Sequence, residues 1–311
     1  MARPVMLPRR TIVVSGLAFV DTSDPYNGLG NPFAVVIGAD VGTWDVARRQ
    51  MLARGTGAPE TVFIDALREP RGQMSSSLDY ELDLTILTPT GKSLGACAHG
   101  FLGAAHVLTE AGFTEPGHNF TIRTSAGGLA RSSLSRSGTV MLHFVSQEPR
   151  IAYGHEKALE KIFHLRLPSL ADGLPILSVG SPKLTVEVTS STFAELRLGL
   201  DSMDYEELMA LQRKLDINGI HLFCRNGNTS LPERVIQVNA YLGRSLCVDR
   251  ATGVSSAAQV SADPYVRNGQ ELQITQYTRV GRSASLSLTK GENRHVHVGG
   301  AAIVVDYQRL R

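Results

Sequence analysis

Residues 88–108 read TPTGKSLGACAHGFLGAAHVL, a turn-rich and nearly uncharged segment that leads from an apolar strand into an apolar helix. A helix N-terminus carries unpaired N–H groups and the positive end of the helix dipole, so it stabilises a carboxylate or a developing anion without a metal. Cys97 and His99 fall at this position. We therefore expect a substrate pocket here, in which the dipole keeps the His99 ring neutral.

Composition excludes several classes of protein. The chain has 311 residues, enough for two lobes, and its formal net charge of +2 is too small for a nucleic-acid-binding surface. Its cysteines, Cys97, Cys224 and Cys247, are odd in number and lack C-x-x-C spacing, which argues against a disulfide framework and a structural zinc site. No apolar run is long enough to span a bilayer, and the start lacks a signal-like pattern. We expect a cytoplasmic protein that binds neither nucleic acid nor membrane.

The pattern of elements predicts an α+β fold. Short β-rich runs occupy residues 11–14, 33–37, 61–64, 80–87 and 139–144, and a second series occupies 176–179, 183–188, 221–224, 234–240, 272–275 and 284–288. Helical periodicity is limited to 46–52, 100–111 and 205–215. Because the order of elements roughly repeats, we predict an N-terminal lobe over 1–146 and a C-terminal lobe over 147–297. Residues 296–305 read as a pair of apolar strands around two glycines, and residues 298–311 are expected to return to the first lobe.

Six motifs occur along the chain: NGLGNPFAVV at 27–36, PETVF at 59–63, TPTG with CAH at 88–91 and 97–99, DRATG at 249–253, QYTRVGRS at 276–283 and HVGG at 297–300. In this order they resemble the PhzF-like family of phenazine-biosynthesis isomerases, which has the diaminopimelate epimerase superfold. The resemblance implies two pseudo-symmetric lobes, each a curved sheet or barrel around a central helix. It also implies an active site in the cleft between them, with central helices that begin near His99 and Gly253.

The resemblance also implies roles for individual residues. Glu60 corresponds to the general acid/base, His99 to the active-site histidine and Asp249 to an opposing acid. The two helix N-termini would bind the substrate through Ala98, Gly100, Thr252, Gly253 and Val254. Considered without the family, Glu60 is a strand-end glutamate, His99 a capping or packed histidine, and Asp249 a turn residue or helix cap.

Several departures from the family pattern concern the substrate. Ala98 replaces a glycine that often precedes the histidine, and one extra residue lies between the TPTG turn and Cys97. The segment VDRATGV at 248–254 lacks the family's Glu, Pro and final Ser. Arg250 could instead reach an anionic substrate, and Cys247 would share a strand face with Asp249. Both Cys97 and Cys247 are possible site residues, with burial as small apolar side chains as the alternative.

Two further patterns do not indicate cofactors. Gly28-Leu-Gly30 begins like a dinucleotide-binding loop, but Asn31-Pro32 and a β-rich run follow where a glycine and a helix are required. His295 and His297 would share a strand face but have no third ligand nearby. We therefore expect neither a cofactor nor a metal.

The sequence thus predicts a cofactor-independent isomerase that moves a proton within a small cyclic amino-acid-like carboxylate. By resemblance it would act in secondary metabolism, on a pyrroline carboxylate of an antibiotic pathway or on a dihydroaromatic substrate, and would form a homodimer. One alternative is an amino-acid racemase or epimerase that uses Cys97. Another is a non-catalytic ligand-binding protein that keeps the fold.

Overall fold

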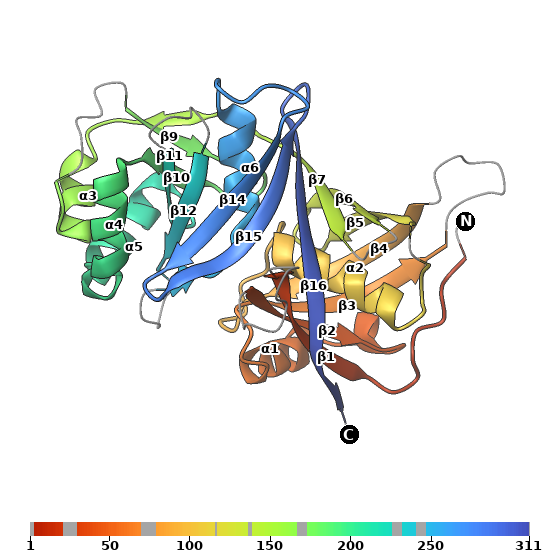
Figure 1. Cartoon of the computed structure of the whole chain (residues 1–311). Coiled ribbons are helices and arrows are strands. Elements are labelled where there is room, and N and C mark those ends of the chain that lie inside the picture. Colours follow the sequence, from red (N-terminus) through yellow and green to blue (C-terminus); the bar gives the residue numbers. More distant parts are fainter. Residues whose placement is uncertain are drawn as a thin grey trace. The chain divides into compact units, whose positions relative to one another are not determined.

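The computed structural model describes residues 3–310 except 21–29, 70–78, 116, 136–138, 167–172, 226–231 and 241–246. Residues 27–29 of the first motif lie outside the described residues. The chain divides into two compact units, Met1–His143 with Gly299–Arg311, and Phe144–Val298, and both mix strands with helices (Figure 1). Among the described helices, none is long and apolar enough to cross a membrane.

The first unit is an eight-stranded barrel. Seven strands follow one another in the sheet in chain order, and β16 lies next to β7 and pairs antiparallel with β1, which closes the sheet. The strands are β1 (Ile12–Val20), β2 (Asn31–Ile37), β3 (Thr61–Arg68), β4 (Asp79–Leu87), β5 (Asn119–Thr124), β6 (Leu129–Leu134), β7 (Val140–Val145) and β16 (His295–Arg309). Parallel neighbours need a long connection, and helices supply it: α1 (Val46–Gly55) links β2 to β3 and α2 (Ala98–Glu110) links β4 to β5.

Helix α2 fills the barrel. Ten of its 13 residues are buried, and it packs against β1, β2, β3 and β6. Two glycines allow this close approach: a Cβ on Gly100 would lie 2.8 Å from Val62 Cγ2, and one on Gly103 would lie 2.6 Å from Cγ of Phe33. The other face of β2 and β3 packs against α1 through a separate apolar cluster that includes Trp44.

Residues 296–305 do not form two strands as predicted. They belong to the single strand β16, which pairs with β1 from Ala301 to Arg309 through two register shifts. A Cβ on Gly300 would lie 2.4 Å from the Phe19 ring and 3.1 Å from Leu102. Glycine is therefore needed here for close packing inside the barrel, and not for a turn.

The second unit repeats this plan. Its sheet runs in the order β8 (Arg150–Ala152), β9 (Leu174–Leu177), β10 (Lys183–Glu187), β11 (Ile220–Arg225), β12 (Pro232–Asn239), β14 (Glu271–Thr278) and β15 (Gly281–Lys290), with β13 (Cys247–Asp249) beside β12. Helix α6 (Gly253–Ala262) links the parallel pair β12 and β14, as α2 links β4 and β5. It is buried over Gly253–Ser261 and packs against β9 and β15, near opposite ends of this sheet, so the sheet curves around it.

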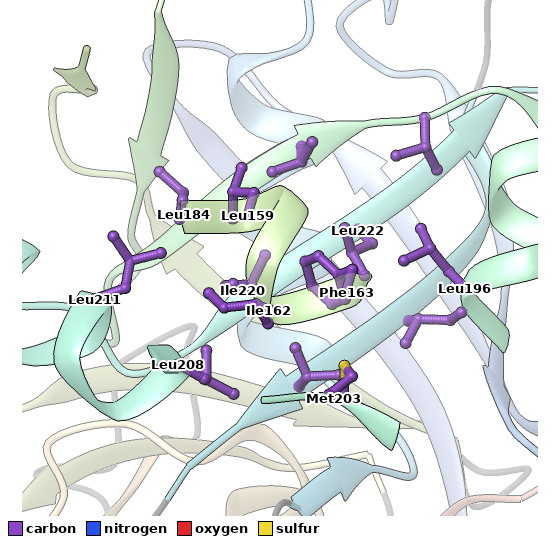
Figure 2. Packing of buried hydrophobic residues seen from close by; sticks show 14 of the residues in the cluster. Leu159, Ile162, Phe163, Leu184, Leu196, Met203, Leu208, Leu211, Ile220 and Leu222 are labelled. Carbon is purple, nitrogen blue, oxygen red and sulfur yellow. The ribbon is translucent and has the colours of Figure 1, made fainter. Parts of the chain in front are cut away.

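Three helices cover the other face of the second sheet: α3 (Glu156–Phe163), α4 (Ser190–Gly199) and α5 (Tyr205–Leu215). Two short 3-10 turns, Val41–Thr43 in the first unit and Leu200–Ser202 here, complete the helical elements of the described chain. Figure 2 shows Leu159, Ile162 and Phe163 of α3 meeting side chains from the strands and the other two helices. The segment 205–215, predicted to be helical, forms α5, and its Leu208, Met209 and Leu211 pack into this core.

Candidate active site

The turn that precedes α2 sets the position of His99. After β4, the Thr88 carbonyl accepts from the Gly91 N–H, and Gly91 has a φ of +88°, which favours glycine. Helix α2 then begins with Cys97 as its N-cap, and the first helical hydrogen bond runs from the Phe101 N–H to the Cys97 carbonyl. The N–H groups of residues 98–100 therefore have no partner within the helix, as helix geometry requires.

Glu60, His99 and Asn31 meet at this helix end, each from a different element. Glu60 immediately precedes β3, Asn31 opens β2, and His99 is the second residue of α2. Glu60 Oε2 lies 2.9 Å from His99 Nε2, and the Asn31 Nδ2 amide lies 3.1 Å from His99 Nδ1. The three residues are only 8%, 7% and 2% exposed in the order Glu60, His99 and Asn31. Each ring nitrogen of His99 therefore has a polar side chain beside it, in a buried environment that excludes most water.

Cys97 completes this cluster. Its Sγ lies 3.5 Å from Nε2 and 3.6 Å from Nδ1 of His99. Burial raises the pKa of the Cys97 thiol, which outweighs the effect of the neighbouring imidazole. A raised pKa makes this thiol a weaker source of thiolate than a free cysteine.

The charge on His99 differs from the expectation based on the helix dipole alone. Burial by itself lowers the pKa of His99, but the groups beside the ring, Cys97 and Glu60, raise it well above its usual value. Both neighbours contribute to this rise, and the interaction with Cys97 is the larger of the two. The expectation of a ring kept neutral by the dipole is wrong in direction, since a full charge at 2.9 Å acts more strongly than the partial charge of a helix end.

One atom of the cluster is left without a hydrogen bond. Glu60 Oε2 is buried, and although it lies close to His99 Nε2, it has no hydrogen-bond partner of acceptable geometry in the described structure. A buried carboxylate oxygen without a partner is costly and is usual where a substrate or ion binds. Glu60 is therefore available to exchange a proton with a bound molecule.

The remaining predicted residues lie in the second unit. Asp249 ends β13, Thr252 is the N-cap of α6, and Gly253 and Val254 are its first two residues. The Ala251 N–H donates to Asp249 Oδ1 at 3.2 Å, which is the turn geometry that the residue type alone suggests. Arg250 follows directly, and Cys247 opens β13.

Gln276 and Ser283, which the sequence analysis named only as parts of a motif, hold the backbone of residues 249–252 in place. Gln276 accepts from the Thr252 N–H at 2.7 Å and donates to the Asp249 carbonyl at 2.6 Å. Ser283 donates to the Arg250 carbonyl at 2.6 Å. Both belong to the QYTRVGRS motif, and both are buried. They position the N-terminus of α6, as Asn31 positions His99 in the first unit.

Sequence reasoning quoted Asn31 within a motif but gave it no role. In the sequence, Asn31-Pro32 reads as an ordinary turn signal before a strand, so it did not single out Asn31. The contact with His99 depends on α2 returning beside β2, and this packing is not readable from sequence.

Comparisons with known proteins agree with this architecture. The family model PhzC-PhzF, described as phenazine biosynthesis-like protein, matches residues 18–307. No curated protein matches the chain. A PhzF-family protein from Bacillus anthracis is 18% identical, with a TM-score of 0.71 and coverage of 97% of this chain and 99% of that one. A predicted epimerase from Pseudomonas aeruginosa is 19% identical, with the same TM-score and coverage.

A more distant structure shares the same fold. A hydroxyproline epimerase from Agrobacterium vitis, solved with trans-4-hydroxy-L-proline bound, is 13% identical with a TM-score of 0.59, and the match covers 97% of this chain and 92% of that one. The expected diaminopimelate-epimerase-like fold is therefore confirmed.

Proposed function

Since the chain belongs to the family of phenazine biosynthesis-like proteins, we propose that it is a cofactor-independent isomerase that moves a proton within a small cyclic amino-acid-like carboxylate. The observation that carries this proposal is the buried pair of Glu60 Oε2 and His99 Nε2, 2.9 Å apart at the N-terminus of α2. A carboxylate held in a fixed, buried position can remove a proton from a bound molecule and return it.

The proposed reaction needs only one proton carrier. The Glu60 carboxylate removes a proton from one carbon, and the electron pair of that C–H bond moves into the adjacent double-bond system. The resulting carboxylic acid returns the proton to the far carbon on the same face, so the double bond migrates and nothing is oxidised. His99 stabilises the charged form of Glu60, and the N–H groups at Ala98 and Gly100 favour binding of the substrate carboxylate.

The substrate class follows from the residues and from the resemblance. A helix N-terminus favours a carboxylate, and the buried, apolar surroundings of α2 favour a small compact ring. We propose a pyrroline carboxylate or a dihydroaromatic carboxylate of secondary metabolism, with the altered segment 248–254 favouring the former. We also propose that the protein acts in the cytoplasm as a homodimer, which light scattering on the purified chain would test.

Proton NMR of candidate carboxylates in deuterated buffer tests this function. We expect the signals of the migrated double bond to appear, with solvent deuterium at the receiving carbon in those turnovers in which the Glu60 carboxylic acid exchanges its proton before returning it. Glu60→Gln should lower kcat by about 10²–10⁴-fold. The matched control is Glu110→Gln, because Glu110 forms a comparable pair with His106 at the far end of the same helix, with 3.2 Å between Nε2 and Oε2. Turnover that persists at the wild-type rate in Glu60→Gln would remove Glu60 as the proton carrier. Ligand binding by the wild type without turnover of any candidate would favour the non-catalytic binding protein.

Asp249 has a proposed role as a second polar contact for the substrate. Asp249→Asn keeps the Oδ1 acceptor for the Ala251 N–H but removes the charge. We expect a rise in KM or a fall in kcat with an unchanged thermal midpoint. Kinetics identical to those of the wild type would remove Asp249 from the site.

A second candidate function is amino-acid racemisation or epimerisation with Cys97 as one base. The contact of Cys97 Sγ with His99 Nε2 at 3.5 Å favours it, whereas the raised pKa of the buried thiol is unfavourable for a thiolate base. The discriminating result is deuterium at an alpha carbon with loss of optical rotation. Activity of this kind that disappears in Cys97→Ala but survives in Cys224→Ala would favour the epimerase.

A further inference from the structure

A row of polar side chains crosses four neighbouring strands of the second unit. His221 of β11 is the register partner of Gln237 in β12, and Gln237 is the partner of Asp249 in β13. On the other side, Thr185 of β10 is the partner of His221. Register partners lie on the same face of a sheet, with Cβ atoms about 4.5–5.5 Å apart. The row therefore leads without interruption to Asp249.

The row lies on the face of the sheet opposite the three covering helices. The residues beside it in sequence belong to, or pack against, the apolar core beneath α3, α4 and α5: Leu222, Ile236, Val238 and Val248. Because side chains alternate along a strand, the row points away from that core. His221 and Gln237 are both 0% exposed, so bulk water does not satisfy their polar atoms.

We propose that Gln237 is a positioning residue for Asp249, and that His221 in turn orients Gln237. This inference rests on the proposed role of Asp249 as a contact for the substrate. One N–H of the Gln237 side-chain amide donates to the Asp249 carboxylate, and the other donates to a ring nitrogen of His221. Two N–H groups on one nitrogen require two acceptors, and an ionised carboxylate and a neutral imidazole supply them.

Asn239 decides which way the Gln237 amide faces, since amide nitrogen and oxygen are assigned from the hydrogen bonds they make. With its amide turned over, Asn239 donates to the Asn218 carbonyl at 2.6 Å and to the Val238 carbonyl at 3.1 Å. The same nitrogen then lies 2.7 Å from the Gln237 amide, which must present its oxygen there. The Gln237 nitrogen thus takes the other amide position, where an oxygen is buried without a hydrogen-bond partner among the described residues.

His221 supplies the acceptor at one end of the row. Gln237 lies close enough to interact with the ring, yet neither Nδ1 nor Nε2 has a partner of acceptable geometry within the described chain while the Gln237 oxygen faces it. An amide nitrogen in that place donates to the unprotonated ring nitrogen. Burial lowers the pKa of His221 to about 3, so the ring stays neutral at neutral pH and keeps this acceptor.

Asp249 lies at the other end of the row. Its carbonyl accepts from Gln276 at 2.6 Å, and its Oδ1 accepts from the Ala251 N–H at 3.2 Å. Gln237 adds a charge-assisted hydrogen bond from the neighbouring strand, and such bonds are stronger than those between neutral groups. A carboxylate held by both the turn and the sheet is already oriented when a substrate binds, so less order has to be imposed on binding.

NMR of the ¹⁵N-labelled full chain tests the row without any substrate. We expect a scalar coupling across the hydrogen bond between Gln237 Nε2 and one ring nitrogen of His221, which disappears in Gln237→Met. The Gln237 amide protons should shift in Asp249→Asn. An amide oxygen facing the ring gives no such coupling, so its absence in the wild type would overturn the proposal. This measurement does not depend on whether any variant folds.

Kinetics test the positioning role. Gln237→Met keeps the length of the side chain but removes both donors, and we expect it to lower kcat/KM by about 10-fold. His221→Phe leaves the donors in place but removes the acceptor that orients them, so its effect should be smaller. The double variant Gln237→Met/Asp249→Asn should be little worse than Asp249→Asn alone, because the two residues act as one unit.

The matched control is Gln259→Met. Gln259 is a second buried glutamine of this unit and donates to Asp263 at 3.0 Å, so the variant also loses a buried hydrogen bond but should leave kcat/KM unchanged. Wild-type kinetics in Gln237→Met, or effects of Gln237→Met and Asp249→Asn that multiply, would refute the positioning role. If Asp249→Asn alone has no effect, the proposed role of Asp249 fails, and the coupling still decides whether Gln237 and His221 form the row.

Discussion

Replacing Gly103 with alanine tests the packing that carries His99. Gly103 lies four residues after His99 on α2, so both are on one face of the helix, and that face meets β2. A Cβ at Gly103 would lie 2.6, 2.7 and 2.9 Å from Cγ, Cδ2 and Cδ1 of Phe33. Phe33 is 1% exposed and is two residues from Asn31 in β2. The ring therefore cannot move without shifting the strand that positions the site.

Two opposing effects determine how much Gly103→Ala changes the free energy of unfolding. Apolar carbon atoms sit about 3.5–4.0 Å apart, so the new methyl group overlaps three ring atoms by about 1 Å. Overpacking of this kind costs about 1–3 kcal/mol, and this overlap belongs in the upper part of that range. Alanine in place of glycine in a helix contributes about 1 kcal/mol in the opposite direction. We expect Gly103→Ala to lower the free energy of unfolding by about 2 kcal/mol.

The assay is urea denaturation of the wild type, Gly103→Ala and a control, Gly55→Ala. Gly55 is the exposed last residue of α1, and a Cβ there would meet no atom within 4 Å. Gly55→Ala should therefore be neutral or stabilise by about 0.5 kcal/mol. If Gly103→Ala is as stable as Gly55→Ala, the close approach of α2 to β2 is not what places His99, and the description of the site would need revision.

Two further outcomes concern stability. Burial lowers the pKa of His221 to about 3, below the ordinary value of about 6.5, so the unfolded chain takes up that proton first as the pH falls. The wild type should therefore lose up to about 1.4 kcal/mol per pH unit between those values relative to His221→Leu, and parallel curves of unfolding free energy against pH would contradict this. Arg49 donates to Asp65 at 2.6 Å with both side chains largely buried, so Arg49→Ala should destabilise by about 3 kcal/mol in denaturant titrations, while the exposed Arg54→Ala changes stability by less than about 0.5 kcal/mol. Equal effects of the two arginine variants would mean that the ion pair contributes nothing.

Elements with strong local signals were predictable. The buried strands 33–37 and 61–64 and the helical segments 100–111 and 205–215 correspond to β2, β3, α2 and α5. Their apolar periodicity arises from burial on one side or on all sides, and it is present in the sequence itself. Gly299 and Gly300 led to the wrong prediction of two strands, because glycine is common both in turns and where chains pack closely. Only the structure shows which role applies, since the Phe19 ring lies directly beside Gly300.

The sequence named the residues that cluster at the N-terminus of α2 but did not predict their contacts. Glu60, Cys97 and His99 were identified by motif, yet their distances depend on how α2 packs inside the barrel. Asn31 was quoted without a role for the same reason, since its partner is 68 residues away along the chain. Gln276 and Ser283 were likewise named only as parts of a motif. Their hydrogen bonds to residues 249–252, seen in the structure, show that they position this segment.

By itself, the sequence determined that residues 88–108 form a turn and then a helix, since turn residues and an apolar run encode local structure. It also determined the family, since the motifs occur in order along the chain. Only the tertiary structure decided the electrostatics of that helix end. The dipole, a local property, predicted a neutral His99, but the carboxylate of Glu60 comes from 39 residues earlier and lies 2.9 Å away. Charge interaction depends on distance in space, and that distance is set by packing.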